Sequence, residues 1–152
     1  MTSRRITLVA ILLVTVAVGA MREFVFINLN YCIDHLANHR QVNYAHSLFR
    51  KAVEGLTLNS LVVLKWSFTI AFIGVMLGAS VFTARLLFGD HRYARPIMWG
   101  FVVIAALALA LHLAAQHVPA LALASIKLIH LLQYPVLLFF LWAAALLRER
   151  TA

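Results

Sequence analysis

The chain has few of the residues that build disulfide-rich or catalytic soluble domains. Its 152 residues include one cysteine, three prolines and only five acidic side chains. A single cysteine, Cys32, excludes an intrachain disulfide. The chain also contains no Gly-rich phosphate loop, no zincin motif and no serine nucleophile elbow. These absences favour a non-catalytic protein over an enzyme.

What the chain has in abundance is apolar residues, which make up 64% of it, against 12% that are charged. Runs of about 20 apolar residues are typical of membrane helices. Four such runs occur, and they predict an all-α protein in which one domain is a four-transmembrane-helix bundle, with spans at 6–27, 61–87, 96–115 and 121–147.

The formal net charge of +8 sits in short loops and tails. Such placement is typical of residues that set membrane topology and meet anionic lipid, so we expect no nucleic-acid partner. The positive-inside rule puts both termini on the cytoplasmic side of an inner (plasma) membrane, together with the loop around residues 85–95. The cationic residues behind this prediction are Arg4, Arg5, Arg85, Arg92, Arg95, Arg148 and Arg150.

The long first loop, residues 31–57, would then face outward and hold an amphipathic helix. Its apolar positions share one side of a helix, its charged positions share the other, and Gly55 is a plausible residue just beyond the end. The pattern predicts a helix lying in the membrane interface. The apolar set is Leu48, Phe49, Ala52, Val53 and Leu56. Asn59 is a candidate cap for the following span.

Helix one is expected to continue beyond the membrane surface. Glu23, Asn30 and Asp34 are spaced i, i+7, i+11, which places them within about 40° on one helical face. The alternative is a polar exit loop over residues 28–38.

Ionisable and polar side chains inside the spans gather at one end of the predicted bundle. Charge within a bilayer is costly, so such residues indicate a functional or bundle-locking site. Glu23 requires a cation, which Arg22, Lys65 or Lys127 could supply. We expect Glu23 to pair across helices with Lys65 or Lys127. The alternative for the lysines is snorkelling to the interface. The predicted outer polar layer comprises Arg22, Glu23, Lys65, His112, Lys127, His130 and Gln133.

Two patterns concern helix packing. Gly74 and Gly78 form a GxxxG pair, which favours close approach of another helix, either the third span or a second copy of the chain. Pro135 lies inside the fourth span and should kink it, because proline removes a backbone hydrogen bond.

Histidines leave a second class of function open, a small redox or metal-binding membrane protein. His112 and His130, in adjacent spans, could hold haem b between two imidazoles. His35 and His39 are spaced i, i+4, which on a helix presents two ligands to one divalent metal. A nucleophile–base pair of Cys32 with either loop histidine, with Arg22 stabilising an oxyanion, is a further alternative.

Four strings along the chain resemble the small four-span membrane proteins associated with exosortase systems. They are Arg22-Glu23-Phe24-Val25-Phe26, Leu64-Lys65-Trp66-Ser67-Phe68-Thr69, Arg85-Leu86-Leu87-Phe88-Gly89-Asp90 and Leu131-Leu132-Gln133-Tyr134-Pro135. The resemblance covers most of the chain, although Tyr134 interrupts the Gln-Pro pair typical of that family. It implies an accessory subunit of a membrane processing enzyme, with other integral membrane proteins as partners, no cofactor and no catalytic residue.

Overall fold

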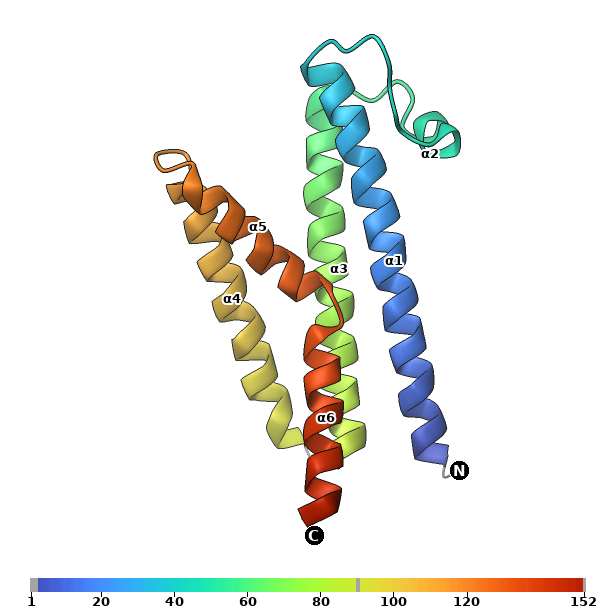
Figure 1. Cartoon of the computed structure of the whole chain (residues 1–152), viewed down its shortest axis with the longest axis vertical. Helices are drawn as coiled ribbons and strands as arrows, with labels where there is room; N and C mark the ends of the chain where they lie inside the picture. The colour runs from blue at the N-terminus through green and yellow to red at the C-terminus, as the bar shows by residue number, and fades with distance from the viewer. Residues whose placement is uncertain (1–2, 90, 152) are drawn as a thin grey trace. The chain divides into compact units, whose positions relative to one another are not determined.

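The structure is a computed structural model that describes the backbone of residues 3–89 and 91–151 and the side chains of residues 6–89 and 92–143 (Figure 1). The chain is 84% helical, and the described residues include no strand. The prediction of an all-α protein is therefore confirmed. Arg4, Arg5, Arg148 and Arg150, which enter the orientation prediction, lie outside the described side chains.

Three helices are long and apolar enough to cross a membrane, and a fourth span is possible if one bent pair of helices is counted together. The first three are α1 (Ser3–Ala37), α3 (Leu58–Phe88) and α4 (Ala94–Ala114). The bent pair is α5 (Ala120–Gln133) and α6 (Val136–Thr151). The remaining elements are α2 (Ser47–Ala52) and a short 3₁₀ turn, η1 (His91–Tyr93).

Helix α1 confirms that the first span continues past a bilayer core. Its 35 residues rise about 52 Å, whereas the core is about 30 Å thick. The residues up to Ala37 are helical, which excludes an exit loop over most of 28–38.

Helix α3 begins one residue after Thr57, which caps it in place of the predicted Asn59. The Thr57 hydroxyl accepts a hydrogen bond from the Ser60 backbone N–H at 3.3 Å, the usual N-cap to N3 contact. Asn59 lies inside the first turn, so the assignment of the cap to Asn59 was wrong.

Helix α2 is shorter than the amphipathic pattern predicts. It ends at Ala52, and Gly55 takes the left-handed conformation (φ 81°) two residues after the C-cap Val53. Phe49 and Val53 turn inward, whereas Leu48 and Leu56 are exposed. The apolar residues of the pattern therefore divide between two directions.

Pro135 interrupts the predicted fourth span more completely than a kink. Tyr134 is extended (φ −103°, ψ 154°), the conformation that a following proline imposes. Helix α5 ends at Gln133, α6 begins at Val136, and the two are bent by 58°.

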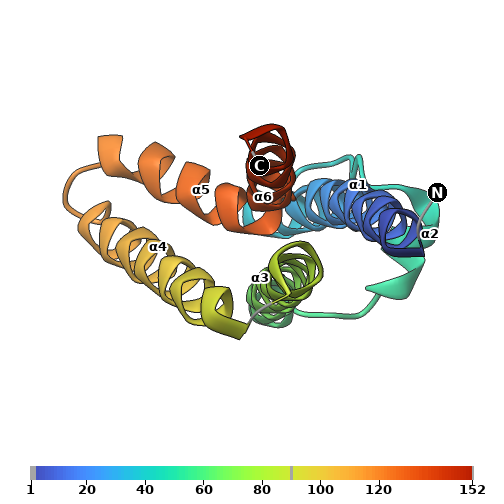
Figure 2. The ribbon, with the colours of Figure 1, turned by 90° about the horizontal axis from the view of Figure 1, so that it is seen from below.

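The chain divides into two compact units. The hairpin unit is Val18–Phe72, which holds the second half of α1, α2 and the first part of α3. The broken-helix unit is Met1–Ala17 with Ile73–Ala152. In the broken-helix unit α4 and α5 lie side by side as an antiparallel pair (Figures 1 and 2).

Candidate functional site

The polar residues of the hairpin unit centre on Arg22. Its side chain is buried, and its Nη1 donates to Glu23 Oε2 at 2.6 Å. The guanidinium also stacks 4.8 Å from the centroid of the Phe26 ring, a cation–π contact. Arg22, one of the cations proposed for Glu23, thus forms an ion pair with it. The Glu23 side chain remains 50% exposed, so the pair lies at the edge of the unit.

Asn28 connects α1 to the segment that joins α1 and α3. Its Nδ2 donates to the Phe24 carbonyl at 2.7 Å, and its Oδ1 accepts from the His46 backbone N–H at 2.5 Å. Asn28 is buried. Sequence reasoning treated it only as the start of a polar loop, because a lone asparagine near a helix exit carries no signal of its partner 18 residues later.

Further contacts hold the connecting segment, residues 38–57, against the two helices. Asn43 Oδ1 accepts from the Ala45 N–H at 2.9 Å, and Ala45 packs in a small buried cluster with Cys32 and Leu61. The rings of Phe24 and Phe49 meet edge to face with centroids 6.3 Å apart. Tyr31 and Tyr44 are in contact with centroids at 6.1 Å. The connecting segment is therefore packed against α1 and α3 through buried and hydrogen-bonded contacts.

The first histidine pair does not have the helical geometry that its spacing requires. Helix α1 ends at Ala37, and His39 has a left-handed backbone (φ 47°) outside it. Asp34 next to His35 is engaged by Arg40, whose Nε donates to Asp34 Oδ2 at 2.7 Å. Within the described residues no group of three or more His, Cys, Asp or Glu side chains could hold a metal ion. A metal at His35 and His39 stays a prediction, without the helical geometry that the i, i+4 spacing assumed.

Cys32, proposed as a nucleophile, is buried in the apolar cluster of the hairpin unit. The polar contact found for its sulfur is the Asn43 amide nitrogen at 3.8 Å. A buried thiol in apolar surroundings behaves as a small hydrophobic side chain. Its position favours a packing role.

The predicted outer polar layer is divided between the two units. Arg22, Glu23 and Lys65 belong to the hairpin unit, where Lys65 is half-buried on α3. The remaining members belong to the broken-helix unit, where His112 and Lys127 are exposed, His130 is half-buried and Gln133 is buried.

The second histidine pair, His112 and His130, is offset along the antiparallel pair of helices α4 and α5 in the broken-helix unit. Ser125 Oγ donates to the Ala108 carbonyl at 2.8 Å, and both residues are buried. This contact sets the register, and in an antiparallel pair it places His130 opposite residue 103 of α4. His112 is nine residues further along α4, about 14 Å at the helical rise. Two histidines that bind one haem iron cannot be offset by this distance along the helix axes. The register therefore does not favour a haem between His112 and His130.

The GxxxG glycines do not make the contact expected of them within their own unit. A Cβ placed at Gly74 or Gly78 would meet no atom of the broken-helix unit within 4 Å, and both residues are exposed. In the third span, Ala108 instead faces α5. Dimerisation of two copies through the glycines stays a prediction.

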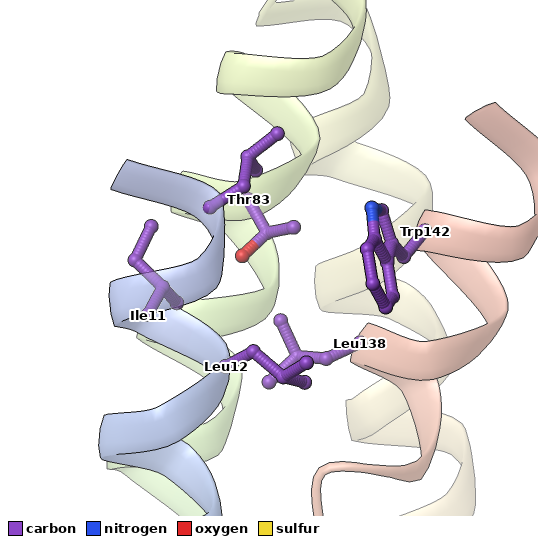
Figure 3. A pocket seen from close by; sticks show the side chains of 6 residues that line it. Ile11, Leu12, Thr83, Leu138 and Trp142 are labelled. Atoms are coloured by element: carbon purple, nitrogen blue, oxygen red, sulfur yellow. The ribbon is translucent and has the colours of Figure 1, made fainter. Parts of the chain in front are cut away.

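A small cavity lies in the broken-helix unit where the starts of α1 and α6 and the end of α3 meet. Its volume is 20 Å³, room for about one water molecule. The Thr83 hydroxyl faces it among Ile11, Leu12, Leu138 and Trp142 (Figure 3). Within the described residues this hydroxyl has no hydrogen-bond partner. The cavity is too small for an organic ligand.

Comparison with models of known protein families, with curated proteins and with solved structures finds no match to this chain.

Proposed function

We propose that this chain is a non-catalytic accessory or scaffold subunit of an inner-membrane protein complex. It docks its partner through the connecting segment (residues 38–57) of the hairpin unit. Both chain termini then lie in the cytoplasm and the connecting segment lies on the outer side, as the positive loop around Arg85, Arg92 and Arg95 favours.

One observation carries this proposal: the connecting segment is fixed in place yet exposes large apolar side chains. The Asn28 amide oxygen accepts a hydrogen bond from its backbone at His46, and the Phe24 and Tyr31 rings contact its Phe49 and Tyr44 rings. Its Tyr44 and Leu48 side chains are nevertheless 67% and 71% exposed. Exposed apolar side chains on an ordered surface are typical of protein–protein or membrane interaction sites.

The charge of the same segment indicates what kind of partner would fit. Arg40, Arg50 and Lys51 are exposed beside the apolar residues. A complementary surface would offer an apolar patch bordered by carboxylates. The resemblance to exosortase-associated proteins suggests a membrane-bound processing enzyme as the partner.

A co-purification experiment tests the proposal. The tagged chain would be isolated from its native membrane in mild detergent, and bound membrane proteins would be quantified by mass spectrometry. The double variant Tyr44→Ser with Leu48→Ser should lose a stoichiometric partner that the wild-type chain retains. Gln41→Ala, an exposed polar change in the same segment, is the matched control and should keep it.

Two results would contradict the proposal. A wild-type chain that purifies alone and monodisperse has no partner to dock. A partner retained equally by the double variant binds elsewhere on the chain.

A further inference from the structure

An apolar groove of 430 Å³ lies between α4 and the broken α5–α6 pair. Its origin is the break at Pro135. Helix α5 packs against α4 through the Ser125–Ala108 contact, while the 58° bend turns α6 away from the direction of α5. The volume of the opening beside α4 falls within the range of about 300–1,000 Å³ that is typical of small-molecule sites.

The length of the groove matches one leaflet of a bilayer. Its lining extends from Tyr93, just before α4, to Ile104 on α4, which is twelve residues or a rise of about 17 Å. Half of a hydrocarbon core is about 15 Å. A transmembrane helix of a partner would need a surface twice as long, whereas one acyl chain fits this one.

The lining offers hydrocarbon and little else. Beyond Tyr93 every lining side chain is apolar, and Leu132 and Phe101 form a buried floor. Gly100, with no atom within 4 Å of its Cβ position, leaves the α4 side open. Apart from Tyr93, no lining side chain can form a hydrogen bond with a polar ligand. The groove therefore favours an acyl chain over a polar molecule.

Two arginines lie next to groove-lining residues in the chain. Arg92 precedes Tyr93 and Arg95 precedes Pro96, and both arginines are exposed. The Tyr93 ring is held against Phe88 with centroids 4.6 Å apart. Arginines beside an interfacial tyrosine are suited to the phosphate of an anionic lipid headgroup.

From these observations we propose that the groove binds one acyl chain of an anionic phospholipid whose phosphate is held by Arg92 and Arg95. The site is independent of the docking surface proposed above, because it lies wholly in the broken-helix unit. Its failure and the failure of the docking proposal are therefore separate results.

The test is native mass spectrometry of the delipidated full-length protein in detergent. Dioleoyl phosphatidylglycerol and dioleoyl phosphatidylcholine, which share their acyl chains, would be titrated separately. Both headgroups carry a phosphate, but the choline ammonium cancels its charge in phosphatidylcholine. The two arginines therefore predict a preference of roughly 30-fold for the net anionic phosphatidylglycerol, about 1 kcal/mol per arginine. Glycerol 3-phosphate, which has no acyl chain, should not compete.

Two pairs of variants locate the lipid. Gly100→Leu fills the groove and should abolish retention of one phosphatidylglycerol, whereas Ala106→Leu, an exposed position of α4 outside the groove, should not. Arg92→Gln with Arg95→Gln should erase the headgroup preference, whereas Arg50→Gln with Lys51→Gln should leave it. Circular dichroism checks that each variant keeps its helicity.

Equal retention of the two lipids would overturn the proposal. So would retention that survives Gly100→Leu, a preference unaffected by the Arg92 and Arg95 changes, or a polypeptide that crosslinks to Ile97 in place of lipid.

Discussion

The two units of this chain hold their helices together by different means. In the hairpin unit, side-chain amides of Asn28 and Asn43 fix a long connecting segment by directional hydrogen bonds, and a buried Arg22 pairs with Glu23. In the broken-helix unit, α4 and α5 are joined by a hydrogen bond from Ser125 to Ala108, and both helices consist mainly of apolar residues. Directional contacts give one unit an ordered surface, whereas apolar packing around a break leaves the other with a groove.

The hydroxyl groups sharpen this difference. Ser67, Thr69 and Ser80 each donate to a carbonyl four residues earlier on their own helix, which satisfies the group without joining helices. Ser125 instead reaches another helix, because Ala108 is small enough to let the two backbones approach. At Ser125 the hydroxyl thus forms an interhelical contact at a point where a small residue faces it.

The largest effect is expected at that approach. Ala108→Leu would force α4 and α5 apart at a fully buried position and should destabilise the protein by about 3 kcal/mol, the upper end for overpacking. The measurement is unfolding in detergent with increasing dodecyl sulfate. Ala110→Leu, at an exposed position of the same helix, should change little. Equal losses from the two variants would mean that α4 and α5 are not packed at Ala108.

The second effect concerns the amide that pins the connecting segment. Asn28→Ala removes both hydrogen bonds of a buried side chain and should cost about 2 kcal/mol. Because the segment contains Arg40, Arg50 and Lys51, trypsin should cleave it at least about tenfold faster. Asn30→Ala, at an exposed position on α1, is the control. An unchanged cleavage rate in Asn28→Ala would show that the segment is held by other contacts.

The smallest effect concerns which cation, Arg22 or Lys65, is energetically coupled to Glu23. A double-mutant cycle of Arg22→Ala and Glu23→Ala should give a coupling of about 0.5–1 kcal/mol, since the two form an ion pair with a half-exposed acid. The cycle of Glu23→Ala with Lys65→Ala should be closer to additive. A larger coupling of Glu23 with Lys65 than with Arg22 would instead support the predicted cross-helix pair of Glu23 and Lys65.

Features set by local chemistry could be predicted from the sequence. The apolar runs predicted the long helices, and Pro135 predicted the interruption of the fourth span because a proline removes a hydrogen bond wherever it lies. The polar residues near the end of α1 predicted a helix that leaves the membrane. Each of these inferences depends on a single stretch of chain.

Features that need two distant segments could not be predicted. The Asn28–His46 and Ser125–Ala108 contacts join residues that no local pattern relates, and the second sets the offset of His112 from His130. Likewise, the i, i+4 spacing of His35 and His39 assumed a helix that ends at Ala37. The polar layer was predicted from depth alone, which does not specify the unit to which each member belongs.

Hydrogen–deuterium exchange of the wild-type protein in detergent tests most directly whether the connecting segment is a preordered docking surface. Amides that are hydrogen-bonded and buried exchange slowly, while those of a mobile loop exchange almost at once. If the segment is preordered, the His46 and Ala45 amides should be protected to a degree similar to the first turns of α3. Exchange of both amides within the dead time would contradict it.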